Sequence, residues 1–338
     1  MRPGVYHEGL VIDKALDIIG DGALEEIIVS ATASSCLVMQ TSAAAAVRNL
    51  TLRGRARGGA GAAQVAGFFA VDIPHGRLLL EGCDISSDSL SCVAIHNATA
   101  EPTIRRCRIH HGADSGVYAF DAAGGILEAC DIFENANIGV AVTSGARTSV
   151  SGCHVHHGGD AGIVVWQGAA NAIEDCDIYL NAKTNVGASD KGQTTLRRCR
   201  IHEGHNTGVF VHRDGRAALE ECNIYRHPEA EVAATSGGDV RLRNCRIHQG
   251  RRTASLCAKR GRCCWKRAMC CITTCPAYVD AGGVGVARSC RINENNHVGV
   301  SCEAGGAVTV EDSELRGNRV AAWQTHHGSL VDSRNNRV

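Results

Sequence analysis

The chain has 338 residues, of which 39 are glycine, 18 are cysteine and only 5 are proline. Its 35 basic and 35 acidic side chains cancel, so it lacks the positive surplus that binders of nucleic acids and anionic membranes need. We therefore expect no nucleic acid and no membrane as partner, and no apolar run is long enough for a transmembrane helix. The many cysteines, without a visible signal peptide, favour a reducing location in the cytoplasm or nucleus.

A repeat of about 23 residues runs through most of the chain. Aliphatic residues recur three residues before, two after and ten after each repeated cysteine, as Ile104, Ile109 and Val117 do around Cys107. Cys290 and Ser313 continue the column further along the chain. The regular cysteines lie 23 or 24 residues apart and are Cys83, Cys107, Cys130, Cys153, Cys176, Cys199, Cys222 and Cys245.

Each repeat has the pattern of three short strands joined by three corners. Inward and outward residues alternate around Cys107 with the period of two that is typical of a strand. The three-residue gap after Ile104 breaks that period and predicts one corner, while glycines such as Gly116 and asparagines such as Asn135 mark the others. The sequence thus predicts an all-β fold, a single-stranded right-handed parallel β-helix (β-solenoid) of about 12 coils of about 23 residues.

The cysteine column and the charges beside it have structural interpretations. We interpret the thiols as small apolar groups stacked inside the coil, because one cysteine per coil gives no tetrahedral set of metal ligands. Acidic coils mostly alternate with basic ones, as Glu81, Arg105 and Glu128 do. Opposite charges on neighbouring coils are therefore predicted to pair and help fix the register, at about 0–1 kcal/mol for each exposed pair.

We expect a single β-helix domain over residues 1–338, interrupted at 251–283 by an irregular cysteine-rich loop or disrupted coil. A zinc knuckle and a basic nucleic-acid patch are the alternatives for this segment. The abrupt start at Met1, with no element covering the first coil, leads us to expect a fragment of a longer protein. The cysteines of the segment are Cys257, Cys263, Cys264, Cys270, Cys271 and Cys275.

A stripe of imidazole and aromatic side chains is the candidate binding site. It lies three residues after the cysteines, where side chains should face outward, and such groups suit sugar rings or protein partners. The alternative is stacking that only stabilises the rod. The stripe consists of His110, Phe133, His156, Tyr179, His202, Tyr225 and His248. A second column on another face consists of His96, Phe120, Trp166 and His212.

Metal binding by histidines of the stripe and their neighbours is a further alternative, but no acidic third ligand is obvious in the sequence. We therefore expect no metal ion, no cofactor and no catalytic residue. The histidines concerned are His110, His111, His156 and His157.

Two segments carry resemblances to known families. The opening PGVYHE at residues 3–8 resembles the first coil of pectin-lyase-fold proteins. The C-x-I…G-V-x-V…L-E-x-C-x-I coils are similar to the β-helix region of F-box substrate receptors of SCF ubiquitin ligases, which carbohydrate-binding repeats and alginate epimerases share. The sequence YAFD at 118–121 resembles the first half of an epimerase motif, although Ala122 and Ala123 replace its Pro-His.

The resemblance implies a non-catalytic recognition module, and more specifically the substrate-binding part of an F-box-type subunit in protein ubiquitination. Its expected partner is then a protein substrate or adaptor. The alternative is a polysaccharide-active lyase, epimerase or hydrolase of the pectin-lyase fold, with a polysaccharide as its partner.

Overall fold

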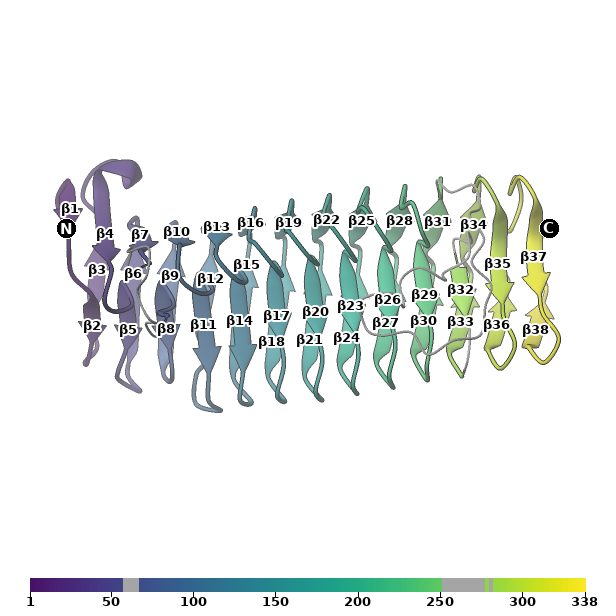
Figure 1. Ribbon diagram of the computed structural model, residues 1–338, viewed down its shortest axis with the longest axis horizontal. Helices are drawn as coiled ribbons and strands as arrows, with labels where there is room; N and C mark the ends of the chain where they lie inside the picture. Colours follow the sequence, from purple (N-terminus) through teal and green to yellow (C-terminus); the bar gives the residue numbers. More distant parts are fainter. Residues whose placement is uncertain (57–66, 251–276, 280–281) are drawn as a thin grey trace, which may run out of the picture.

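The computed structural model describes residues 1–338 except 57–66, 251–276 and 280–281. These residues wind into an elongated rod whose coils lie side by side from the N-terminal to the C-terminal end (Figure 1). Three sheets, which we name A, B and C, run the length of the rod, and every strand pairs in parallel with the strand one coil away. The predicted parallel β-helix is confirmed. Sheet A has 12 strands and sheets B and C have 13 each, in agreement with the predicted number of about 12 coils.

The strands are short, and a 3-10 turn at Leu24–Glu26 (η1) precedes β4. Sheet A contains β1 (Gly4–Tyr6), β4 (Ile27–Ala31), β7 (Thr51–Gly54), β10 (Asp84–Ser87), β13 (Arg108–Gly112), β16 (Asp131–Phe133), β19 (His154–His156), β22 (Asp177–Tyr179), β25 (Arg200–His202), β28 (Asn223–Tyr225), β31 (Arg246–His248) and β34 (Arg291–Asn293). Sheet B contains β2 (Leu10–Ile12), β5 (Leu37–Met39), β8 (Val71–Ile73), β11 (Val93–His96), β14 (Val117–Phe120), β17 (Val140–Val142), β20 (Ile163–Val165), β23 (Val186–Ala188), β26 (Val209–Val211), β29 (Val232–Ala234), β32 (Ala277–Val279), β35 (Val298–Cys302) and β37 (Ala321–Thr325). Sheet C contains β3 (Asp17–Ile19), β6 (Ala44–Arg48), β9 (Arg77–Glu81), β12 (Thr103–Arg105), β15 (Gly124–Glu128), β18 (Arg147–Ser151), β21 (Ala170–Glu174), β24 (Gln193–Arg197), β27 (Arg216–Glu220), β30 (Asp239–Arg243), β33 (Val284–Arg288), β36 (Ala307–Glu311) and β38 (Leu330–Arg334).

The cysteine column lies at the corner where sheet C turns into sheet A. One residue in the left-handed region makes this corner, such as Asp175 with φ +53°. The backbone N–H of Cys153 donates to Sγ of Cys176 at 3.4 Å, and the Cys176 thiol donates to the carbonyl oxygen of Glu174 at 3.2 Å. The thiols are buried, as predicted, and their sulfur atoms also accept the backbone N–H of the cysteine one coil earlier.

Ser313 takes the place of a cysteine in this column and makes the same hydrogen bonds to the backbone. It occupies the cysteine position in a later coil, and its Oγ accepts the N–H of Cys290 at 3.1 Å. The same hydroxyl donates to the carbonyl oxygen of Glu311 at 2.8 Å. A serine therefore makes both of the contacts that a cysteine makes in the earlier coils.

At the corner between sheets A and B, a large side chain on one coil fills the space beside a glycine on the neighbouring coil. Asn135 points inward and accepts the N–H of Gly112 at 2.9 Å, and the facing residue of the coil before it is Gly116. A Cβ at Gly116 would lie 2.8 Å from the Asn135 amide, so glycine is required there. Where one partner of such a pair is large, the other is glycine.

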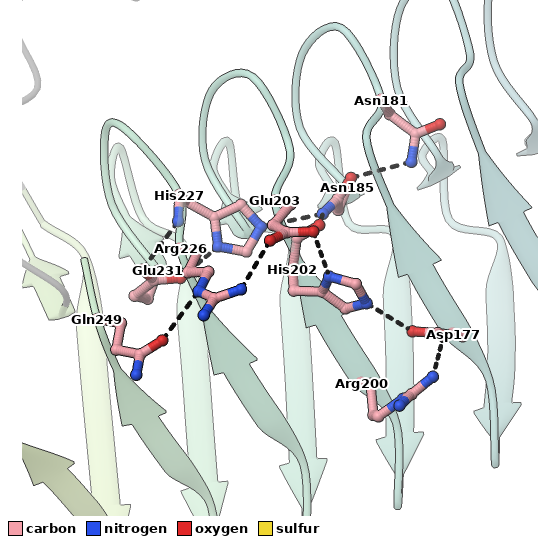
Figure 2. Close-up of polar contacts among 10 residues, drawn as sticks. All are labelled: Asp177, Asn181, Asn185, Arg200, His202, Glu203, Arg226, His227, Glu231 and Gln249. Atoms are coloured by element: carbon pink, nitrogen blue, oxygen red, sulfur yellow. Dashed lines mark hydrogen bonds and ion pairs between the residues drawn. The ribbon is translucent and has the colours of Figure 1, made fainter. Parts of the chain in front are cut away.

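At this corner His227 and Glu231 take the place of the asparagine and glycine of earlier coils. Both side chains are fully buried, and the His227 Nδ1–H donates to the Glu231 carboxylate. Glu231 also accepts the backbone N–H of His227 at 3.0 Å, and the His227 Nε2 lies 2.9 Å from the Asn185 amide. Figure 2 shows this cluster continuing through Asn185 to Asn181.

The predicted charge pairing between coils is confirmed on the outside of sheet C. Arg105 lies 3.0 Å from Glu81, and Arg197 lies 3.0 Å from Glu220. Further along, Arg288 lies 2.8 Å from Glu311. These arginine side chains are 39% to 61% exposed, so each pair contributes about 0–1 kcal/mol.

The predicted irregular segment 251–283 lies largely outside the described residues. Within it, Ala277–Val279 is β32, which pairs with β29 and β35. The described residues form no helix that is long and apolar enough to cross a membrane.

Candidate functional site

The predicted stripe on sheet A forms one continuous stack of rings. Neighbouring ring centroids lie 4.7–5.4 Å apart, with angles of 4° to 17° between the ring planes. The structure therefore brings all seven predicted residues together on the outside of sheet A. Because each inner ring is covered on both faces by its neighbours, the stack leaves mainly ring edges for a ligand. The predicted binding role of this stripe stays a prediction.

The histidines of the stack are held by polar groups one coil earlier. The Nε2 atoms of His156 and His202 lie 2.9 Å from the carboxylates of Asp131 and Asp177. His248 makes the same contact with the side-chain oxygen of Asn223 at 2.9 Å. Figure 2 shows His202 between Asp177 and Glu203. These contacts orient the rings and occupy their Nε2 atoms, which explains the stack as a stabilising feature of the rod.

The paired carboxylates of sheet A are held in their charged form. Burial alone would raise the pKa of Asp177, but the hydrogen bond from His202 and the contact with Arg200 outweigh burial and lower its pKa. Burial acts in the same way on Asp84, and there the hydrogen bond from His110 and the charges of His110 and Arg108 outweigh it and lower the pKa. Both carboxylates therefore stabilise the fold when they are ionised.

We expect this stabilisation to disappear in acid. A carboxyl group whose pKa is lower in the folded state contributes stability above its unfolded pKa of 3.8 and loses that stability as the pH falls further. Between about pH 5 and pH 2, the free energy of unfolding of the double variant Asp84→Asn/Asp177→Asn should fall less steeply than that of the wild type. Urea unfolding followed by circular dichroism across this range measures both slopes. Equal slopes would contradict the assignment.

The second predicted column lies on the outside of sheet B and differs from the first in its packing. From Phe120 onward, aromatic or imidazole side chains occupy every second coil, and short hydroxyl side chains, of which Thr143 and Ser189 are buried, occupy the coils between them. His96 lies on the coil directly before Phe120. Phe120 packs against Tyr118 at 4.6 Å, and His212 against Phe210 at 4.8 Å. No ring contact is found for Trp166 among the described residues. In chain order the column is His96, Phe120, Thr143, Trp166, Ser189, His212 and Thr235.

Polar groups follow this column at the turn into sheet C. Gln167 comes directly after Trp166, and its side-chain oxygen accepts from the hydroxyls of Thr143 at 2.8 Å and Ser144 at 3.2 Å. Burial, together with the charge of Arg213, lowers the pKa of His212, so its ring is neutral at neutral pH. The face thus combines half-buried rings with hydrogen-bonding groups, which is the composition of many ligand sites.

An imidazole and a phenol lie at the N-terminal end of this face. The His96 Nε2 lies 2.8 Å from the Asp72 carboxylate, which leaves Nδ1 as its proton acceptor, and its ring stacks on Phe120 at 4.9 Å. Tyr118 lies on the same strand as Phe120, and burial, with the charges of Asp114 and Asp121, raises its pKa. A proton acceptor and a hydroxyl donor are therefore present at one end of the face. The sequence reasoning missed Asp72, which lies 24 residues before His96.

A shallow hollow of about 540 Å³ lies over a different face, the outside of sheet C. Its floor is built from small side chains such as Ala172 and Ala218. The charged groups on its rim already pair with one another, as Arg197 and Glu220 do. It therefore offers fewer unsatisfied groups to a ligand than the sheet B face.

The coiled fold, with columns of aromatic and imidazole side chains on the outside of sheets A and B, defines a β-helix repeat protein. The chain belongs to the right handed beta helix region family, whose model matches residues 35–191 and 184–338. This match confirms the right-handed coil that the sequence predicted. None of the curated proteins matches the chain in sequence.

Solved structures with the same fold include three polysaccharide enzymes. The periplasmic alginate epimerase AlgG is similar over 99% of this chain and 78% of its own, with a TM-score of 0.63 and 12% identity. The catalytic domain of GH87 α-1,3-glucanase in complex with nigerose matches 99% of this chain and 63% of its own, at TM-score 0.55 and 10% identity. The AlgE4 A-module, a mannuronan C-5 epimerase of Azotobacter vinelandii, matches 98% and 89%, at TM-score 0.51 and 14% identity. At these identities the likeness shows the fold alone.

Proposed function

We propose that this protein binds a polysaccharide that lies along the rod on the outer face of sheet B. The observation that carries the proposal is the alternation of ring and hydroxyl side chains on successive coils, with Phe120, Trp166 and His212 two coils apart. Successive coils are about 4.8 Å apart, which is close to the length of one sugar unit in an extended chain. Every second sugar would then contact an aromatic or imidazole ring.

The chemistry of the face fits sugars better than a protein partner. Half-buried rings offer apolar surface to the C–H groups of a pyranose ring, and the polar edge around Gln167 and Asp190 offers hydrogen bonds to its hydroxyls. The similar structures named above act on alginate, mannuronan or α-1,3-glucan, as their names state. They support polysaccharide recognition by this fold, whereas none of them is an F-box receptor. A role in ubiquitination stays a prediction. A location in the cytoplasm or nucleus also stays a prediction.

Trp166→Ala is expected to weaken polysaccharide binding by about tenfold, because one ring contact is worth on the order of 1–1.5 kcal/mol. Affinity electrophoresis in gels containing alginate, pectin, an α-glucan or a β-glucan measures the change for each polymer. The control is Tyr179→Ala, which removes a ring of similar kind from sheet A and should leave binding unchanged.

Two results would contradict the proposal. One is wild-type protein that is not retarded by any of the four polymers. The other is an equal loss of binding in Trp166→Ala and Tyr179→Ala, which would mean that the sheet B face is not the site.

A further inference from the structure

Two adjacent histidines on sheet A lie outside the polysaccharide face and have a geometry of their own. His110 belongs to the ring stack, and His111 follows it at φ +52°, where the register between β10 and β13 shifts. The two rings meet edge to face, with their Nδ1 atoms 2.7 Å apart. The His111 side chain is 62% exposed, so the pair is open to solvent.

Both histidines direct their other ring nitrogen at a carboxylate. The His110 Nε2 lies 3.0 Å from Asp84, and the His111 Nε2 lies 3.2 Å from Glu134. A carboxylate only accepts hydrogen bonds, so the hydrogen bond to Asp84 places the hydrogen of His110 on Nε2. The negative charge of Glu134 beside the His111 Nε2 favours the same tautomer of His111. In the neutral imidazoles, both Nδ1 lone pairs then face each other at hydrogen-bond distance. Such an arrangement is relieved by a proton or a metal cation between the two nitrogens.

We propose that the Nδ1 atoms of His110 and His111 bind one divalent transition-metal ion of the Cu²⁺ class. Metal-binding histidines commonly donate their second N–H to a carboxylate, which is the role of Asp84 and Glu134 in this pair. With metal–nitrogen bonds of about 2.0 Å, the observed separation of 2.7 Å gives an angle near a right angle. That angle fits neighbouring positions of a tetragonal Cu²⁺ or Ni²⁺ site better than tetrahedral Zn²⁺. Water would fill the remaining positions.

The chain contains a matched pair that lacks one part of this site. His156 and His157 lie two coils further along, with their Nδ1 atoms also 2.7 Å apart and the His156 Nε2 2.9 Å from Asp131. The place of Glu134 is taken in that coil by Leu180, which has nearly the same backbone angle. His157 can therefore carry its hydrogen on Nδ1 and donate it to His156. We expect no tight metal site at this second pair.

Titration of the metal-free full chain with Cu²⁺, followed by calorimetry and electron paramagnetic resonance, tests the proposal. Wild-type protein should bind one Cu²⁺ with two nitrogen ligands. His111→Asn, in which asparagine tolerates the left-handed backbone, should lose this signal, and His157→Asn should keep it. The cysteines are the same in all three proteins, so they cannot produce the difference.

Two carboxylate variants sharpen the test. Glu134→Gln should weaken Cu²⁺ binding by about tenfold or more, because it no longer fixes the His111 tautomer. Leu180→Glu should create a second Cu²⁺ site at His156 and His157. A wild-type protein without a nitrogen-ligated Cu²⁺ signal would show that the pair merely shares a proton and would overturn the proposal. Equal losses in His111→Asn and His157→Asn would overturn it as well.

Discussion

Glu231→Ala is expected to lower the free energy of unfolding by about 3–5 kcal/mol, because it leaves two buried donors, the His227 ring Nδ1–H and the His227 backbone N–H, without their charged acceptor. The substitution removes the carboxylate that pairs with the His227 ring and accepts the His227 backbone N–H at 3.0 Å. Both side chains are fully buried, so water cannot replace the lost contacts. Equilibrium unfolding in urea, followed by circular dichroism, measures the change.

A double variant serves as the control for this prediction. His227→Asn/Glu231→Gly copies the pair Asn135 and Gly139, which occupies the same corner four coils earlier. Because the preceding coil has a glycine at the facing position in both places, Gly116 and Gly208, the asparagine should find the same space. We expect the double variant to regain most of the stability that Glu231→Ala loses. A double variant that is less stable than Glu231→Ala would show that the two corners are not equivalent.

The fold could be predicted because each buried position of a coil accepts only certain residue types, and these types recur every 23 residues or so. One small thiol per coil at a one-residue corner, as at Cys107 and Cys130, predicts the positions of the strands from β10 to β31 to within a residue or two. The first coils carry no cysteine that marks them, because Leu50 stands where Cys83 stands one coil later, and a leucine gives no distinctive signal. Spacing alone also did not show that the thiols bond to the backbone.

The candidate sites were predictable only as columns. Spacing placed Phe120, Trp166 and His212 on one face and the seven-ring stripe on another, and the structure agrees. Whether rings cover each other depends on what lies on the coils between them, and there Thr143 and Ser189 separate the sheet B rings. The sequence reasoning looked for an acidic third ligand near the histidine pairs. In the structure the acids contact the far ring nitrogens instead.

Cys176→Val is expected to lower the free energy of unfolding by about 2–4 kcal/mol, whereas Cys176→Ser should cost less than half of that. Valine has a similar size but leaves the N–H of Cys153 and the carbonyl oxygen of Glu174 without their contacts to sulfur, at 3.4 and 3.2 Å. Serine keeps a donor and an acceptor, as Ser313 does at the same position. Urea unfolding of the three proteins gives the order of stability.

The comparison separates two physical roles of the column. If the thiols only filled space, the apolar valine would be tolerated at least as well as the smaller, more polar serine, because volume-conserving apolar exchanges cost little in a core. If the corner requires a hydrogen-bonding side chain, the order is cysteine, then serine, then valine. A Cys176→Val protein as stable as Cys176→Ser would therefore refute the hydrogen-bonding role and leave burial as the whole explanation of the repeat.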